Sequence, residues 1–285
     1  MRQIAIVSGK GGTGKTTIAA AFASLAKNKV MADCDVDAAD LYLILNPEIK
    51  EEQEFGGSKI ASIDKEKCTA CGKCVEVCHF GAISDKLVID PIACEGCGVC
   101  YRICPAEAIK FEEKVSGHYF ISETRFGPMV HARLGIAEEN SGKLVSLVRK
   151  KAREVAQEKK LDNIIIDGPP GIGCPVIASL TGVNLALAVT EPTLSGIHDL
   201  ERIIDLTGHF GIKTLVCVSK YDINPENVQR IEEICAKKSV KVAGRIPYDF
   251  EVSKAMRLKK TIIEYNPESN ISGEIIRIWD IINIV

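Results

Sequence analysis

Residues 9–16 restrict the fold of this chain more than any other segment. They read GKGGTGKT, follow an apolar run at residues 4–7 and precede a helical pattern over residues 16–27. This strand–loop–helix context is that of a P-loop, in which glycines let consecutive backbone N–H groups point at phosphate oxygens. The start of the helix adds a favourable field for negative charge. The segment therefore predicts an α/β fold that binds a nucleotide here.

Further short apolar runs along the chain read as buried parallel strands. They lie at residues 30–32, 164–166, 185–189, 214–218 and 242–246. Each is followed by a turn rich in Gly, Pro or Asp, and most then by a helical pattern such as residues 197–208. This alternation predicts a doubly wound, mostly parallel sheet of the P-loop NTPase type, with its ligand at the carboxyl ends of the strands.

The alternation stops over residues 55–115. Eight of the twelve cysteines lie there, between Cys68 and Cys104, and the pattern becomes short, with Gly and Pro at turns. We therefore predict a discontinuous ATPase domain at residues 1–54 and 116–285 and an inserted small α+β domain at residues 55–115. The insert contains an internal repeat, because CTACGKCVEVCHFGAI resembles CEGCGVCYRICPAEAI.

The cysteine spacing of the insert matches a doubled bacterial ferredoxin run, in which the fourth cysteine of each run ligates the other cluster. This predicts two 4Fe–4S clusters. The first would be held by Cys68, Cys71, Cys74 and Cys104, and the second by Cys94, Cys97, Cys100 and Cys78. Zinc is the alternative, although zinc sites rarely use four closely spaced cysteines twice. Electron transfer is the favoured use of such clusters, and a structural or sensing role is the alternative.

The loop and the first helical turn supply the predicted nucleotide contacts. Lys15 should reach the β- and γ-phosphates, and the Thr16 hydroxyl should bind Mg²⁺. The other residues expected to contact the nucleotide are Gly11, Gly12, Thr13, Gly14 and Thr17.

A second lysine at the start of the loop, Lys10, makes the motif resemble the deviant Walker A of the MinD/ParA/nitrogenase-iron-protein superfamily. The resemblance implies an ATP-dependent dimer in which Lys10 reaches the nucleotide of the opposite subunit and acts like an arginine finger. By matching position, Asp33 would order Mg²⁺ through water, and Asp35 would position the attacking water. Asp167 resembles the Walker B aspartate and would hold a water bound to Mg²⁺. The catalytic residues expected are thus Lys10, Lys15 and Asp35.

Two later segments resemble the part of this superfamily that contacts adenine. Ser219 precedes Lys220 where relatives often carry an Asn that reads the base, so this contact departs from the family pattern. Residues 246–249 resemble the loop that packs against adenine, which implies contacts from Pro247 and Asp249.

Four cysteines lie outside the doubled run. Cys174 follows Asp167 by seven positions, near a point where the nitrogenase iron protein binds a cluster shared between subunits. With no second candidate between Cys104 and Cys174, we expect a buried structural cysteine instead. Cys34, Cys217 and Cys235 fit core or helix packing.

The remaining features argue against several other roles. The net charge of −2 gives no electrostatic reason to expect nucleic acid as a partner. Residues 275–282 are apolar at helical spacing and should form a packed last helix, not a membrane-binding one. Residues 143–160 should be a helix with a solvated basic face. Without a signal peptide or a membrane-spanning run, we expect a cytoplasmic protein that does not insert stably into membranes.

Over essentially its whole length the chain resembles MinD-superfamily ATPases with an inserted ferredoxin domain. The expected cofactors are ATP, Mg²⁺ and two 4Fe–4S clusters. The expected partners are a second copy of the chain, or a paralogue in a pseudo-dimer, and a redox protein or apoprotein. The favoured function is ATP-gated electron transfer, because a closed set of eight cysteines does not suit cluster donation. The alternatives are a carrier ATPase for clusters or metal and a MinD-like regulatory switch that senses redox state.

Overall fold

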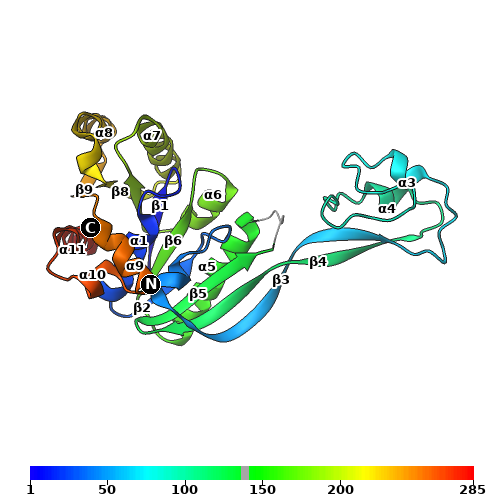
Figure 1. Ribbon diagram of the computed structural model, residues 1–285, viewed down its shortest axis with the longest axis horizontal. Helices are drawn as coiled ribbons and strands as arrows, with labels where there is room; N and C mark the ends of the chain where they lie inside the picture. The colour runs from blue at the N-terminus through cyan, green and yellow to red at the C-terminus, as the bar shows by residue number, and fades with distance from the viewer. Residues whose placement is uncertain (136–140) are drawn as a thin grey trace. The chain divides into compact units, whose positions relative to one another are not determined.

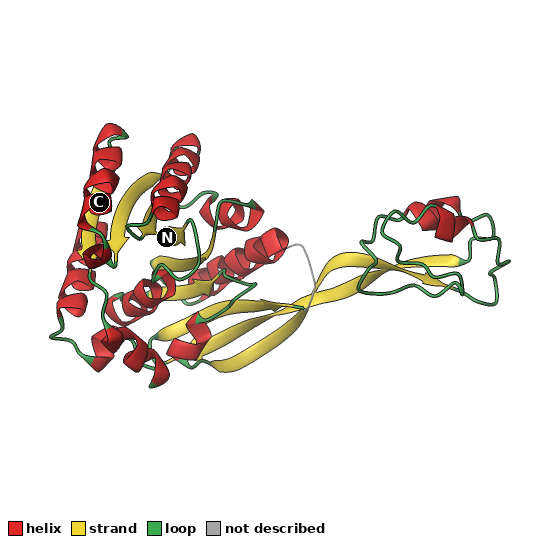
Figure 2. Cartoon of the chain, turned by 45° about the horizontal axis from the view of Figure 1, so that its top comes forward, coloured by secondary structure: helices red, strands yellow, loops and turns green. Residues whose placement is uncertain are grey.

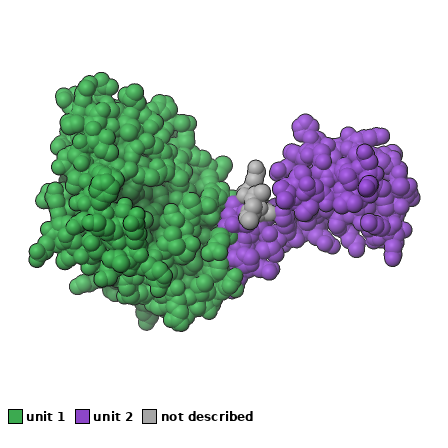
Figure 3. Space-filling model, viewed as in Figure 1, with its two compact units in different colours: residues 1–52, 119–133, 141–285 green, residues 53–118, 134–140 purple. Residues whose placement is uncertain are grey.

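The computed structural model describes residues 1–135 and 141–285, and its described part forms two compact units (Figure 3). Unit 1 comprises Met1–Glu52, Tyr119–Arg133 and Ser141–Val285. Unit 2 comprises Gln53–His118 and a short stretch that begins at Leu134. Each unit is described by itself below.

Among the described residues, nine strands form one sheet in the order β3-β4-β5-β2-β6-β1-β7-β8-β9. Figure 1 labels most of them. Six neighbouring strands of this sheet, in the order β2-β6-β1-β7-β8-β9, are parallel to one another, and β5 is parallel to β2. They are β1 (Arg2–Ser8), β2 (Lys29–Asp33), β6 (Asn163–Pro170), β7 (Leu185–Thr190), β8 (Lys213–Ser219) and β9 (Lys241–Ile246). These six contain the six apolar runs of the sequence, so the prediction of an α/β, mostly parallel P-loop fold is confirmed.

Helices cover the parallel sheet of unit 1 (Figure 2). They are α1 (Lys15–Leu25), α2 (Leu41–Leu45), α5 (Ser141–Glu158), α6 (Cys174–Leu180), α7 (Leu194–His209), α8 (Pro225–Lys237), α9 (Phe250–Arg257), α10 (Ile262–Tyr265) and α11 (Asn270–Ile284), with a 3₁₀ turn η1 at Tyr221–Ile223. Ser, Thr, Asn or Asp side chains cap α7, α8, α9, α10 and α11, which satisfies N–H groups that a helix start leaves unpaired.

The main core lies where α1 and α11 pack on one face of the sheet. The rings of Phe22 and Trp279 lie 4.9 Å apart, and Ile4 and Ile6 of β1 join the same buried cluster. The predicted packed last helix is confirmed, because Ile275 and Ile282 of α11 are fully buried. None of the described helices combines the length and the apolar character that crossing a lipid bilayer requires.

Three strands are absent from the sequence prediction: β3 (Glu48–Ile63), β4 (Ile109–Thr124) and β5 (Gly127–Leu134). Only two residues join β4 to β5, which makes them an antiparallel hairpin. In unit 2, Ser58 Oγ lies 2.8 Å from Ser116 Oγ, and the Asp64 N–H donates to the Ala108 carbonyl at 2.7 Å. These pairs run in opposite directions along the chain, so β3 and β4 are antiparallel as well.

The cysteine-rich segments of unit 2 share one local backbone. Ala70 and Gly72 have positive φ angles of 53° and 74°, and Gly96 and Gly98, which occupy the same places in the second repeat, have 63° and 72°. Each repeat then forms one short helix, α3 (Lys73–Glu76) or α4 (Val99–Ile103).

The hydrogen bonds of the two repeats match too. The N–H of Ala82 donates to Cys78 Sγ and the N–H of Ala108 donates to Cys104 Sγ, both at 3.3 Å. The repeat read from the sequence is therefore also a structural repeat.

Candidate nucleotide site and cysteine cavities

The P-loop connects β1 to α1 through glycines in left-handed conformations. Gly12 has a φ of 78° and Gly14 a φ of 90°, which other residues rarely adopt. A Cβ on Gly14 would also come within 3.2 Å of Ser219 Oγ. Gly11 borders open space, and Thr13 is buried. The loop thus needs glycine for its shape at Gly12 and Gly14.

Lys15 lies at the centre of a buried charge cluster. Its Nζ is 2.9 Å from Asp167 Oδ1 and 3.4 Å from Asp35 Oδ2, and it lies 3.5 Å from Thr16 Oγ1. Asp33 is fully buried beside them, and its Oδ1 accepts the Asp35 N–H at 3.2 Å. Strands β2 and β6 bring these aspartates together, since parallel strands end at the same edge of the sheet.

The cluster carries more negative than positive charge. Three carboxylates surround the one ammonium, and burial, followed by the charge of Asp167, raises the pKa of Asp33 well above its usual value. Burial acts against the Lys15 charge, but Asp167 and Asp35 outweigh it and the Lys15 pKa is raised. A divalent cation would balance this excess.

Several buried oxygens here have no hydrogen-bond partner among the described residues: Asp33 Oδ2, Asp167 Oδ2 and Thr13 Oγ1. Leaving such atoms unpaired costs free energy, and in native proteins they usually have a bound partner. Carboxylate oxygens are the ligands that Mg²⁺ takes in nucleotide sites. The residues present therefore fit Mg²⁺ beside the phosphates.

A cavity of about 240 Å³ opens beside the P-loop. Gly12, Gly14 and Thr17 line one side, and Ser219, Lys220, Pro247, Tyr248 and Asp249 line another. The structure thus brings the segments expected to contact adenine to the phosphate loop. The Asp249 carboxylate also accepts the Glu251 N–H at 2.9 Å and caps α9, so this side chain has a structural task as well.

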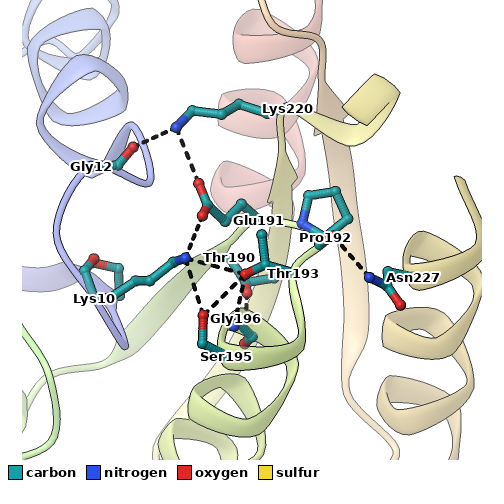
Figure 4. A network of polar contacts seen from close by, with 11 residues as sticks. Lys10, Gly12, Thr190, Glu191, Pro192, Thr193, Ser195, Gly196, Lys220 and Asn227 are labelled. Atoms are coloured by element: carbon teal, nitrogen blue, oxygen red, sulfur yellow. Dashed lines mark hydrogen bonds and ion pairs between the residues drawn. The ribbon is translucent and has the colours of Figure 1, made fainter. Parts of the chain in front are cut away.

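Lys10 is held by its own chain (Figure 4). Its Nζ lies 2.5 Å from Glu191 Oε1, 3.2 Å from Thr193 Oγ1 and 3.2 Å from Ser195 Oγ. The other carboxylate oxygen of Glu191 accepts from Lys220 Nζ at 3.1 Å. Lys220 Nζ in turn donates to the Gly12 carbonyl at 2.7 Å.

Sequence reasoning did not give Glu191 a role. The available signal was its position, since it directly follows the buried strand β7 at the edge where the phosphate loop lies. Its link to residues 10 and 220 depends on the tertiary fold, because both lie far from it in the sequence.

In unit 2 the eight clustered cysteines line two cavities, four cysteines each. Cys68, Cys71, Cys74 and Cys104 line the first. Cys78, Cys94, Cys97 and Cys100 line the second. Each cavity thus takes three cysteines from one repeat and the last cysteine from the other repeat.

The thiols are free, and all twelve cysteines of the chain are unpaired. Burial is the main influence on Cys74 and Cys100, and it raises the pKa of both thiols. Across the residues that the structure describes, no three His, Cys, Asp or Glu side chains are grouped so as to hold one metal ion.

The prediction that Cys174 is buried is wrong. It is exposed at the first residue of α6. This helix packs on α5 and β6 and buries Val176 and Leu180. The apolar run that signals burial begins only after Cys174. Cys34, Cys217 and Cys235 are buried as predicted.

Comparison with known proteins gives a family match over most of the chain. Residues 4–262 match the family described as CobQ/CobB/MinD/ParA nucleotide binding domain. The Methanocaldococcus jannaschii protein MJ0578 is 36% identical over 281 residues, which cover 98% of this chain and 95% of that protein. The uncharacterized ATP-binding protein MJ0547 of the same organism is 26% identical over 282 residues, which cover 96% of this chain and 85% of that protein.

Solved structures show the same fold. The cell division ATPase MinD of Pyrococcus furiosus matches with a TM-score of 0.59 and 20% identity, over 99% of this chain and 98% of that one. MinD of Pyrococcus horikoshii, solved in complex with Mg-ADP, matches with a TM-score of 0.60 and 20% identity, over 99% of this chain and 96% of that one. At this identity the likeness concerns the fold.

Proposed function

This chain belongs to the CobQ/CobB/MinD/ParA nucleotide-binding family, and on that premise we propose that it is an ATPase whose nucleotide state governs electron transfer through two 4Fe–4S clusters. The cofactors are ATP, Mg²⁺ and the clusters. The ATPase half of the proposal is carried by Lys15, which lies at the P-loop between Asp35 and Asp167 with unpaired carboxylate oxygens beside it.

Each residue of this site has a task in the proposal. Lys15 and the backbone of the loop bind the β- and γ-phosphates. Thr16, Asp33 and Asp167 supply oxygens for Mg²⁺ or its bound waters. Asp35 orients the attacking water as a general base. The MinD structure solved with Mg-ADP supports magnesium as the metal.

The cluster half is carried by the two cysteine cavities. Four thiols in each cavity supply the ligand number of a 4Fe–4S cluster, and the exchange of the fourth cysteine between repeats follows the bacterial ferredoxin pattern. Such a cluster supplies one-electron redox chemistry when bound. The cysteines would hold it, and the Ala82 and Ala108 N–H groups, which donate to Cys78 and Cys104 Sγ, would each tune the potential of one cluster.

The test of the ATPase is hydrolysis of ATP by the purified protein with Mg²⁺ and with excess chelator. We expect phosphate release only with Mg²⁺ and none from the Lys15→Ala variant. Hydrolysis that persists in Lys15→Ala would contradict the assigned site.

The test of the clusters is iron, zinc and acid-labile sulfide analysis of anaerobically purified protein. We expect iron and sulfide in equal amounts and a loss of part of both in Cys104→Ser. Cys174→Ser is the matched control, because this cysteine lies outside both cavities, and it should keep its iron. Zinc without sulfide would overturn the cluster proposal and leave the ATPase untouched.

The coupling is tested by potentiometric EPR under anaerobic conditions, with and without ATP. A cluster potential and an electron-transfer rate that both ignore the nucleotide would contradict gating.

Transfer of clusters or metal to an apoprotein is the second candidate function. Cys71 and Cys97 are exposed, one in each set of four, and exposed ligands favour cluster release. Incubation with an apo-ferredoxin and ⁵⁷Fe-labelled protein separates the candidates. Iron that moves to the acceptor only with ATP would favour transfer over gating.

A further inference from the structure

Glu191 links three parts of the nucleotide site, and together with Lys10 and Lys220 it forms what we call the Glu191 network (Figure 4). One carboxylate oxygen contacts Lys10 and the other contacts Lys220. Lys220 lines the cavity beside the P-loop and donates to the Gly12 carbonyl. The network thus extends from the base cavity, across the phosphate loop, to Lys10.

Lys10 has no hydrogen left for a further acceptor. An ammonium group has three N–H donors, and Glu191, Thr193 and Ser195 provide three acceptors within 3.2 Å of Lys10 Nζ. Any phosphate that binds Lys10 must therefore displace one of these contacts.

The turn that carries Glu191 is held by hydrogen bonds on both sides. The Gly196 N–H donates to Thr193 Oγ1 at 3.0 Å, and Thr190 Oγ1 donates to the Gly196 carbonyl at 2.9 Å. A Cβ on Gly196 would lie 2.3 Å from the Glu191 carbonyl oxygen. From the other side, Asn227 Nδ2 donates to the Pro192 carbonyl at 3.1 Å. The turn that carries Glu191 is therefore fixed between β7, α7 and α8.

The loop that carries Lys10 is fixed against the same helix. A Cβ on Gly9 would lie 2.1 Å from the Cβ of Asp199 in α7, so backbone and helix touch directly there. Release of Lys10 from Glu191 consequently requires a side-chain movement, while the two backbones stay in place.

We propose that Glu191 is a positioning residue that retains Lys10 on its own subunit and shares its charge with Lys220, so that the two lysines compete for one carboxylate. The inference rests on the proposed ATPase and on the dimer that the family resemblance implies, in which Lys10 reaches the nucleotide of the opposite subunit. Glu191 opposes that movement, and a nucleotide polyphosphate must outcompete it.

Competition of the two lysines for Glu191 predicts opposite effects on Lys10 when Glu191 is replaced and when Lys220 is replaced. Without the Glu191 charge, Lys10 is released. Without Lys220, Glu191 has only Lys10 to neutralise, and its hold on Lys10 becomes stronger. A residue that merely supports the fold would not produce changes in opposite directions.

The experiment measures the reactivity of the Lys10 amine in full-length protein without added nucleotide. A limiting amount of sulfo-NHS-acetate labels the lysines, and mass spectrometry gives the labelling rate of Lys10 relative to exposed Lys150. We expect Glu191→Gln to raise this rate about fivefold, as the loss of one ion pair of moderate strength implies, and Lys220→Gln to lower it. Glu226→Gln removes an exposed carboxylate of α8 that pairs with Arg230 at 2.9 Å, and it should change nothing.

Ser195→Ala is a second, milder variant that removes one hydroxyl acceptor, and it should raise the rate less than Glu191→Gln does. Unchanged labelling of Lys10 in both Glu191→Gln and Ser195→Ala would overturn the proposal, as would a higher rate in Lys220→Gln.

A second readout addresses the dimer. Sedimentation with a non-hydrolysable ATP analogue should show Glu191→Gln self-associating at a lower analogue concentration than the parent. If neither protein self-associates while the labelling result holds, the dimer that the family resemblance implies fails and the Glu191 contact stands.

Discussion

At the scale of single residues, the aspartates around Lys15 are the most informative group. Among the residues that the structure describes, Asp33 and Asp167 each keep one buried oxygen without a partner, whereas Asp35 lies 3.4 Å from Lys15 Nζ and has no such oxygen. Asp33 and Asp167 therefore suit a bound metal, and Asp35 suits a reacting water.

Asp35→Asn should separate binding from hydrolysis. The amide keeps the size of the side chain but cannot accept a proton, so we expect the ATPase rate to fall about 100-fold, the usual contribution of a general base. ATP affinity, measured by calorimetry with Mg²⁺, should change little. The exposed Asp37, substituted in the same way, is the control. A rate near that of the parent would remove Asp35 from the mechanism.

His131 should make folding sensitive to acid. Burial, assisted by Arg133, lowers its pKa to about 4, and its ring stacks on Phe120 at 4.9 Å and pairs with Ser122 Oγ at 3.0 Å. As the pH falls from 6.5 towards 4, the unfolded chain takes up a proton that the folded chain does not. The free energy of unfolding should therefore decrease with falling pH, by up to about 1.4 kcal/mol for each unit.

Urea unfolding at several pH values checks this. His131→Phe combined with Ser122→Ala removes the titrating group and its partner, and this part of the slope should disappear. His198→Phe, at an exposed position, should keep it. A slope that survives in the double variant would assign the acid sensitivity to other groups.

Local sequence was a good guide to residues whose task is set by a short motif. The P-loop and the eight clustered cysteines have fixed spacing, and the structure places the cysteines in two sets of four around two cavities and Gly12 and Gly14 beside a third. Glu191 and the exposure of Cys174 depend on what the fold brings near or leaves uncovered. The residues next to Glu191 and Cys174 in the sequence do not reveal these tertiary contacts or this exposure.

At the scale of elements, solvent exposure separates β3 from the strands that the sequence predicted. β1, β2, β7 and β8 are buried on both faces and read as continuous apolar runs. β3 begins with seven exposed residues in a row, most of them charged or polar. Hydrogen bonds to the neighbouring strand β4 stabilise this part of β3, and burial contributes little. Its sequence therefore resembles that of a loop.

The last helix offers a matched pair for a test of stability. Ile282 is fully buried in the core, while Ile284 on the same helix is 85% exposed. Ile282→Ala should lower the free energy of unfolding by about 2–4 kcal/mol, and Ile284→Ala by less than about 0.5 kcal/mol. Trp279 is the single tryptophan of the chain and packs on Phe22, so its fluorescence reports on this core directly. Equal effects of the two changes would contradict the packing of α11.

At the scale of the whole molecule, the two units differ in what stabilises them. Unit 1 contains the large core around α1 and α11. In unit 2 the buried apolar side chains of the described residues are few, and half of them are alanine: Phe55, Ala61, Ala82, Ile83, Ala108 and Ile109. A core of this size rarely supports a fold alone, and bound metal commonly supplies the remainder.

Removal of iron from the proposed clusters should therefore unfold unit 2 selectively. After oxidation and treatment with a chelator, we expect rapid trypsin cleavage within residues 53–118. Trp279 fluorescence should stay native, because it lies in the core of unit 1. Anaerobic protein that retains its iron is the control. Resistance to trypsin after complete loss of iron would show that the small core is sufficient.

The exchange of the last cysteine between the repeats bears on how unit 2 could have arisen. One repeat alone supplies three cysteines to one cavity and a single cysteine to the other, so it completes neither. Two identical chains, each with one repeat, would complete both by exchanging their last cysteines. The shortest ancestor with a complete cavity is then a symmetric homodimer, and the present unit is what duplication and fusion of its gene would produce.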